Sequence, residues 1–279
     1  MEKTVCIDWL SFTAHSSGIG IAPLLPEWEK VSDGQPDTPR FGYRKALRYQ
    51  SGLIVMFDGS TPSMGAHYIY SGSAIKALDT ELNDGGLSIL AWHTDKGHKC
   101  TRIDLAVDVR DDNAIMAKIE QMAIDHSWSG TAHTSTLVKS NDNKGSTVYV
   151  GSRTSERFVR IYDKAAQLGE TREWIRIEAE IKGDSARAVA RAIAQIGAMG
   201  LSNVAQSVIT RVCNFPCHEW MSVFDGTPME IGTPKIEEKQ TEKWILGQVA
   251  TALAKFERQY PEKRILERLW EQVSDMLGE

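Results

Sequence analysis

Hydrophobic and polar residues alternate along several short stretches of the chain, which is the pattern typical of β-strands. The stretches predicted as strands are residues 4–12, 42–57, 66–71, 101–109, 146–150, 157–163 and 174–182. Residues 15–39 and 128–145 are rich in small and polar residues and predict loops. The chain shows no internal repeat and no low-complexity tract.

Apolar residues spaced three and four apart predict helices between these strands. One helix is expected from Ser73, as N-cap, to Gly85, and a short one over 87–95. Others are expected after Asp112, from Asp184 to near Gly197, and through 204–212. Strands and helices together predict a mixed α and β architecture.

The composition changes near residue 230. After Pro228 and Pro234 the chain becomes strongly charged, and apolar residues at helical spacing predict two amphipathic helices. We therefore expect one domain over residues 1–230 and a helical C-terminal extension over 231–279.

The overall composition is that of a globular protein, with 42% hydrophobic and 25% charged residues over 279 positions. The sequence contains no apolar run of about 20 residues, and its start lacks the features of a secretion signal. We therefore expect a cytoplasmic protein without a membrane partner. Cys213, Cys217 and His218 resemble half of a zinc site, but no second half is visible, so idle thiols are the simpler interpretation.

Three of the predicted strands carry apolar residues at odd positions and polar residues at even positions. Because side chains alternate along a strand, each strand then has one core face and one charged face. The polar sets are Arg102, Asp104 and Asp108; Arg160, Tyr162 and Lys164; and Arg176, Glu178, Glu180 and Lys182. If the strands are neighbours, these sets share one surface.

Two interpretations of that surface are open. An antiparallel sheet often keeps one face in water, and charged residues there can be a solvated surface and nothing more. However, four carboxylates lie on two of the strands, and like charges repel unless a cation lies among them. A divalent metal ion would remove that repulsion.

The segment from Thr147 to Lys164, TVYVGSRTSERFVRIYDK, resembles the active-site segment of the replication initiation factor family, which includes rolling-circle initiators of small staphylococcal plasmids. TRIDLAVD at 101–108 and WIRIEAEIK at 174–182 resemble the two acidic strands of that family, and IDWLSF at 7–12 also fits. The resemblance covers roughly residues 4–215. It implies an α+β fold with a largely antiparallel central sheet flanked by helices.

The resemblance also implies the chemistry: a site-specific, topoisomerase-like DNA nickase and strand transferase of a rolling-circle plasmid or phage. Tyr162 corresponds to the nucleophile, and Asp104, Glu178 and Glu180 correspond to the ligands of Mg²⁺ or Mn²⁺, with Asp108 in reserve. The implied partners are origin DNA, as a hairpin or single-stranded nick site, a host helicase and polymerase, and a second copy in a homodimer. The His-hydrophobic-His metal motif of other rolling-circle nucleases is absent, because His93 and His98 have the wrong spacing.

The net charge of −5 requires that DNA be bound by a local cluster of cations. Arg160 and Lys164 share the parity of Tyr162, and Arg153 and Arg157 lie in the preceding turn, so these four are the candidate DNA-binding residues. Tyr149 is a competing nucleophile, although packing or base stacking explains it more simply.

Three rival functions remain. A relaxase of an integrative conjugative element would use the same chemistry at a transfer origin. A catalytically silent DNA-binding protein of the same fold would bind without cutting. An unrelated metal-dependent hydrolase would cut with water and form no protein–DNA link.

Overall fold

A computed structural model describes most of the chain. The described residues are 2–14, 26, 34–82, 84–110, 114–141, 145–224, 226–232, 245 and 249–277. The chain divides into two compact units, Met1–Thr233 and Pro234–Glu279. The expectation of one domain over residues 1–230 and a helical C-terminal extension over 231–279 stays a prediction, and each unit is described by itself below.

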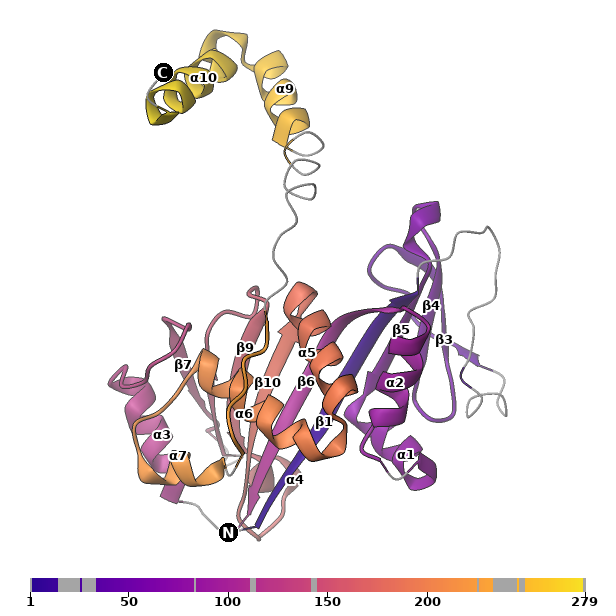
Figure 1. The fold of residues 1–279 in the computed structure, drawn as a ribbon, viewed down its shortest axis with the longest axis vertical. Coiled ribbons are helices and arrows are strands. Elements are labelled where there is room, and N and C mark those ends of the chain that lie inside the picture. The colour runs from indigo at the N-terminus through magenta and orange to yellow at the C-terminus, as the bar shows by residue number, and fades with distance from the viewer. Residues whose placement is uncertain are drawn as a thin grey trace. The chain divides into compact units, whose positions relative to one another are not determined.

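The first unit is built on a ten-stranded sheet in the order β2-β3-β4-β5-β1-β6-β10-β9-β8-β7 (Figure 1). All its strand pairs are antiparallel. The strands are β1 Glu2–Ala14, β2 Gln35–Pro36, β3 Tyr43–Arg48, β4 Ile54–Gly59, β5 Ala66–Ser71, β6 Lys99–Arg110, β7 Ser135–Lys139, β8 Ser146–Val150, β9 Arg157–Asp163 and β10 Trp174–Lys182.

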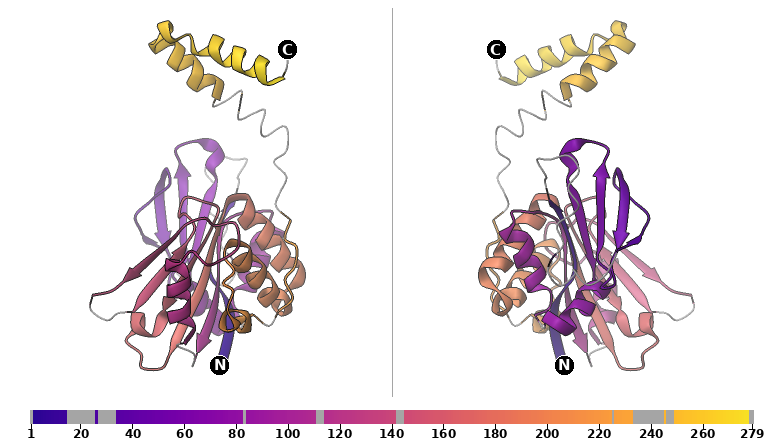
Figure 2. Two further views of the ribbon diagram at one scale, coloured as in Figure 1. Left: turned by 90° about the vertical axis from the view of Figure 1, so that its left-hand side faces the viewer. Right: turned by 90° about the vertical axis from the view of Figure 1, so that its right-hand side faces the viewer.

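Helices pack on one face of this sheet, with α5 and α6 to one side of the central strands (Figure 2). The helices of the unit are α1 Gly72–Leu82, α2 Leu87–Asp95, α3 Ala114–Ile124, α4 Lys164–Leu168, α5 Gly183–Ile196, α6 Leu201–Val212 and α7 His218–Val223. Short 3-10 turns lie at Pro62–Met64 and Ala198–Gly200. The α+β class with a largely antiparallel sheet is confirmed.

The core lies between the helices and the apolar face of the sheet. Ile103 and Leu105 of β6, Ile177 of β10 and Val189 and Ile193 of α5 are all fully buried. Burial of each such side chain stabilises the fold by about 1.5–3 kcal/mol. The apolar faces of β6 and β10 therefore pack against the apolar stripe of α5. The sequence predicts both surfaces, the first from alternation and the second from helical spacing.

Several predicted elements need correction. The strand expected over 42–57 is two strands, β3 and β4, joined by a turn at 49–53. The loop expected over 128–145 contains β7, an edge strand with mostly exposed side chains. Ser73 lies inside α1, and Ser71 Oγ accepts the helix N–H of Ala74 at 3.4 Å instead. Asp112 and most of the loop over 15–39 lie outside the described residues.

β1 changes its facing pattern part-way along. Ile7 pairs with Leu105 of β6 and Trp9 pairs with Asp104, so Asp8 is an extra residue in a β-bulge. Before the bulge Ile7 faces the core, and after it Leu10 and Phe12 do. The bulge places both Asp8 and Trp9 beside the charged face of β6.

The second unit contains two helices, α9 Ala250–Gln259 and α10 Ile265–Leu277, joined by a 3-10 turn at Pro261–Lys263. Both are amphipathic, as expected, and Phe256 and Trp270 are exposed within the unit. Among the described residues, no helix has the length and apolar character that crossing a membrane requires.

A buried histidine makes the stability of the fold depend on pH. His93 of α2 is fully buried, its ring stacks on Phe12 at 4.1 Å, and Tyr70 lies within hydrogen-bonding distance. Burial lowers the pKa of His93 to about 2, so the folded state resists a proton that the unfolded chain accepts below about pH 6.5. We expect the free energy of unfolding to fall as pH decreases below about 6.5, by up to about 1.4 kcal/mol per pH unit for this group.

Urea unfolding at a series of pH values measures this slope. We expect His93→Gln to reduce the slope, whatever its effect on stability at neutral pH, and replacement of the exposed His218 by Gln to leave it unchanged. Equal slopes for wild type and His93→Gln would contradict the prediction.

Candidate functional site

The charged residues of β6, β10 and β9 lie on the side of the sheet opposite the core, and we call this surface the polar face. The register pairs Asp104 with Glu180, Asp108 with Arg176, and Glu178 with Arg160. Tyr162 pairs with Arg176 across the next ladder. The three sets predicted from alternation therefore share one surface.

Asp104 is at the centre of the polar face and only 1% exposed. Arg102 donates two hydrogen bonds to its carboxylate, from Nε at 2.8 Å and from Nη2 at 2.6 Å. The same Nη2 lies 2.8 Å from Glu180, whose other oxygen is 2.9 Å from Lys182 Nζ. Each of these two carboxylates thus faces at least one cation.

Tyr162 lies next to the second buried carboxylate of the polar face. Its hydroxyl donates to Glu178 Oε2 at 3.3 Å, and Arg160 donates to the other oxygen of Glu178. Arg160 Nη2 is also 3.8 Å from Asp104, so one guanidinium lies between two carboxylates. The Nε of Arg160 is buried with no hydrogen-bond partner in the described part of the chain, which leaves one donor for a ligand.

A separate buried ion cluster supports this arrangement from the side of β1. Arg176 forms a two-pronged pair with Asp108, with both hydrogen bonds at 2.7 Å, and its Nη1 donates to Asp8 at 2.6 Å. Trp174 Nε1 also donates to Asp108, at 2.8 Å. Arg176, which is paired in register with Tyr162, is therefore held in place by the β1 bulge and by β6.

The electrostatic surroundings keep the Tyr162 phenol protonated. Burial raises the pKa of Tyr162 and the Glu178 carboxylate raises it further, while Arg176 and Arg160 lower it in part. Burial likewise raises the pKa of Asp104 to about 7, although Arg102 opposes this, and the charges of Glu178 and Glu180 add to it. The two hydrogen bonds that Asp104 accepts from Arg102 favour its ionised form. Positive charge added beside Asp104 would lower its pKa and ionise it fully.

These carboxylates suit a hard divalent cation in donor type, since Mg²⁺ and Mn²⁺ prefer oxygen ligands. Asp104, Glu178 and Glu180 lie on adjacent strands, and the charges of Glu178 and Glu180 raise the pKa of Asp104. In the described residues no group of three potential ligands is already arranged around one point, because Arg102 and Arg160 lie among the carboxylates. A cation would therefore take the place of an arginine.

A protein-family model described as "replication initiation factor" matches residues 98–269, which is more than half of the chain. The chain belongs to this family. The match includes β6, β9 and β10, and with them all the predicted catalytic and metal-binding residues, but it leaves out β1 and the Asp8 bulge.

The fold of this replication initiation factor also resembles a solved structure, a rolling-circle replication initiator protein from Geobacillus stearothermophilus. The two share 20% sequence identity with a TM-score of 0.65, over 84% of this chain and 100% of the other. A comparison with curated proteins finds no match. The family predicted from the three sequence segments is confirmed.

The predicted DNA-binding residues of the replication initiation factor lie on both sides of the sheet. Arg160 and Lys164 are beside Tyr162, with Lys164 Nζ 5.5 Å from the centre of its ring. Arg153 lies over the rings of Tyr149 and Phe158, further along the polar face. Arg157 has the parity of the core residues Val159 and Ile161, so it projects to the helix side of the sheet, away from Tyr162.

Tyr149 also lies on the polar face, but its contacts differ from those of Tyr162. Its ring stacks on Phe158 at 5.8 Å and carries the Arg153 guanidinium at 4.8 Å. Its hydroxyl makes no hydrogen bond to a described residue, in contrast to the Tyr162 hydroxyl, which donates to Glu178. Tyr149 therefore has the surroundings of a packing residue.

Sequence reasoning missed the structural part of the site. It named Arg102 and Arg176 as members of a charged face but not as the partners of Asp104 and Asp108, and it gave Asp8 no role. A signal was present for Asp8: the core residues Val5, Ile7, Leu10 and Phe12 break the period of two between positions 7 and 10, which marks a bulge.

Proposed function

We propose that this replication initiation factor nicks one strand of origin DNA through Tyr162 and so starts rolling-circle replication. The phenol oxygen attacks a backbone phosphorus, and the bond from that phosphorus to the 3′ oxygen breaks. The phenol loses its proton and the departing oxygen gains one. The products are a 5′-phosphotyrosyl link and a free 3′-hydroxyl that a host polymerase extends, and attack by a 3′-hydroxyl on the link rejoins the strand.

One contact supports this proposal above all: the hydrogen bond from Tyr162 to the buried carboxylate of Glu178. A phenol with a raised pKa is a poor nucleophile and needs a proton acceptor in reach. Glu178 is in place to take the proton as the bond to phosphorus forms. Two cations beside Tyr162 support binding of the attacked phosphate there: Arg160, whose buried Nε has no partner among the described residues, and Lys164.

Asp104, Glu178 and Glu180 are the residues that would hold Mg²⁺ or Mn²⁺. When bound, such a cation supplies positive charge that polarises the phosphoryl oxygens. Arg160 would then turn from Glu178 and Asp104 toward the DNA, since one guanidinium cannot serve both. Origin DNA, as a hairpin or single-stranded nick site, is the proposed substrate, and a host helicase, a polymerase and a second copy of the chain are the proposed partners.

The experiment is to incubate the purified protein with Mn²⁺ and supercoiled DNA that carries the gene and its surroundings. We expect a detergent-resistant protein–DNA adduct, and peptide mapping should place the link on Tyr162. Relaxation of the DNA without an adduct would instead indicate hydrolysis by water. Specific binding with neither product would indicate a silent DNA-binding protein, and nicking confined to a transfer origin would indicate a relaxase.

Removing one proposed metal ligand should raise the metal requirement. Glu180 is the most exposed of the three carboxylates, so Glu180→Gln should leave the fold intact. We expect the Mn²⁺ concentration for half-maximal adduct formation to rise about 10- to 100-fold, the effect that disturbed metal coordination commonly has. A Glu170→Gln variant is the control, because Glu170 is exposed and faces Arg110, outside the proposed ligands. An unchanged Mn²⁺ requirement in Glu180→Gln would remove Glu180 from the proposed ligands.

A further inference from the structure

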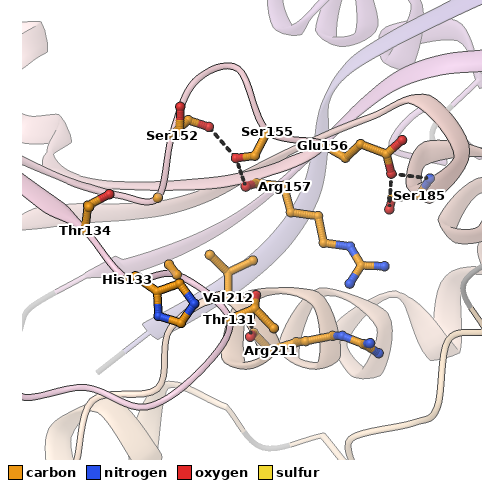
Figure 3. A pocket seen from close by; sticks show the side chains of 12 residues that line it. Thr131, His133, Thr134, Ser152, Ser155, Glu156, Arg157, Ser185, Arg211 and Val212 are labelled. Atoms are coloured by element: carbon orange, nitrogen blue, oxygen red, sulfur yellow. Dashed lines mark hydrogen bonds between the residues drawn. The ribbon is translucent and has the colours of Figure 1, made fainter. Parts of the chain in front are cut away.

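A cavity of about 540 Å³ lies on the helix side of the sheet and is lined by residues from four separate segments. Its polar lining includes Thr131 and Thr134 from the loop before β7, Ser152 and Ser155 from the turn between β8 and β9, and two arginines, Arg157 and Arg211. Figure 3 shows the two arginine side chains, one from β9 and one from the end of α6, extending in the same direction.

The cavity is separate from the polar face. Arg157 is the first residue of β9 and Tyr162 is five positions later, which is about 16 Å along a strand. The two side chains also project to opposite sides of the sheet. A ligand in the cavity would therefore not be the phosphate that Tyr162 attacks.

The positive charges of the two arginines are offset only in part, by the charge of Glu156 acting on Arg157. Neither forms an ion pair with any described residue, and the buried Nε of Arg157 has no hydrogen-bond partner there. Burial lowers the pKa of Arg157 and the positive charge of Arg211 lowers it further, while the charge of Glu156 opposes both. Two guanidinium groups that repel each other and lack a contacting carboxylate fit an anion.

The one carboxylate at the cavity is already in use. Glu156 accepts the hydroxyl of Ser185 at 2.7 Å and the backbone N–H groups of Asp184 and Ser185 at 3.3 and 3.2 Å. It thereby satisfies the first turn of α5 and makes no ion pair with Arg157. The cavity keeps an excess of positive charge.

We propose that Arg157 and Arg211 form a phosphate-binding pocket that holds the backbone of bound DNA at a point outside the cleavage site. The guanidinium groups would bind the phosphate oxygens. The hydroxyls of Thr131 and Ser155 already donate to backbone carbonyls, so the two arginines carry the site. The pocket rests on the proposed function only in taking DNA as the partner, and it is independent of cleavage by Tyr162.

The test measures the affinity for a short labelled duplex of arbitrary sequence, in EDTA, at a series of KCl concentrations. Backbone contacts act on any sequence, and each one adds about 0.9 to the slope of log affinity against log salt. For the double variant Arg157→Gln with Arg211→Gln we expect a loss of about 10-fold in affinity and a slope lower by about 1 to 2. The assay involves neither cleavage nor metal, so its failure and a failure of nicking are distinguishable.

Matched variants separate this site from general charge effects. Arg191 is an exposed arginine on α5 that does not line the cavity, and Arg191→Gln should leave the salt slope unchanged. The charge-conserving double variant with lysine at positions 157 and 211 should keep most of the affinity. Because the two arginines repel, the glutamine variants should unfold at no lower a temperature than the wild type. Should the double variant nevertheless misfold, the single variant Arg211→Gln, at an exposed position, carries the same test.

Two results would overturn the proposal. One is an affinity and salt slope for the double glutamine variant equal to those of the wild type. The other comes from thermal unfolding in sodium phosphate and in sodium chloride of equal ionic strength. If phosphate stabilises the wild type but not the double variant, while both bind DNA equally, the pocket holds free phosphate and not DNA.

Discussion

Replacing Tyr162 with phenylalanine should reduce adduct formation and nicking by more than about 10³-fold, because the variant has no oxygen to attack phosphorus. The ring that packs beneath Lys164 remains, so the fold and the affinity for DNA should change little. The measurement compares the rates at which wild type and Tyr162→Phe form a covalent adduct on origin DNA with Mn²⁺, beside their affinities for the same DNA in EDTA.

Tyr149→Phe is the matched control, because Tyr149 lies on the same face with its ring stacked on Phe158. It should keep nearly full activity. A Tyr162→Phe variant that still forms the adduct would exclude Tyr162 as the nucleophile, and a loss of the adduct in Tyr149→Phe alone would assign that role to Tyr149.

Arg176→Met should lower the free energy of unfolding by about 3–5 kcal/mol. The Arg176 side chain is 3% exposed and is paired with Asp108, which is 9% exposed. Removing the guanidinium leaves a carboxylate buried without its main partner, and the hydrogen bond from Trp174 is a weak substitute. Urea unfolding at neutral pH measures the loss.

A double variant distinguishes a buried unpaired charge from a loss of packing. Arg176→Met combined with Asp108→Leu removes both charges, so it should recover most of the stability lost in Arg176→Met. Arg176→Lys keeps the charge but not the two-pronged geometry, and should lie between the wild type and Arg176→Met. A loss below about 1 kcal/mol in Arg176→Met would show that Asp108 does not depend on Arg176.

The central part of the sheet could be predicted well from the sequence. In β6, β9 and β10 the apolar and charged residues alternate without a break, and this alone put Asp104, Tyr162 and Glu178 each on the polar side of its own strand. Periodicity does not say which strands are neighbours, so the pairing of Glu178 with Arg160 had to come from the fold.

Other parts could not be predicted, for physical reasons. β7 is an edge strand with mostly exposed side chains, so its sequence has little of the apolar alternation that marks a strand. Arg157 follows a turn rich in polar residues, which hides the fact that its parity is that of the core. The carboxylates are paired with arginines, whose long side chains reach across strands. Such pairs follow no periodic pattern in the sequence, so alternation cannot predict them.

The hydrogen bond between Asp8 and Arg176 joins residues 168 positions apart in the chain. At the usual rate of about 5–20 residues per second, a ribosome needs roughly 8–34 s to add Arg176 after Asp8. β1 is therefore synthesised that long before β10, although the two strands lie on either side of β6 in the sheet. The polar face is therefore among the last parts of the sheet to assemble, and in a nascent chain it is incomplete until β10 has emerged.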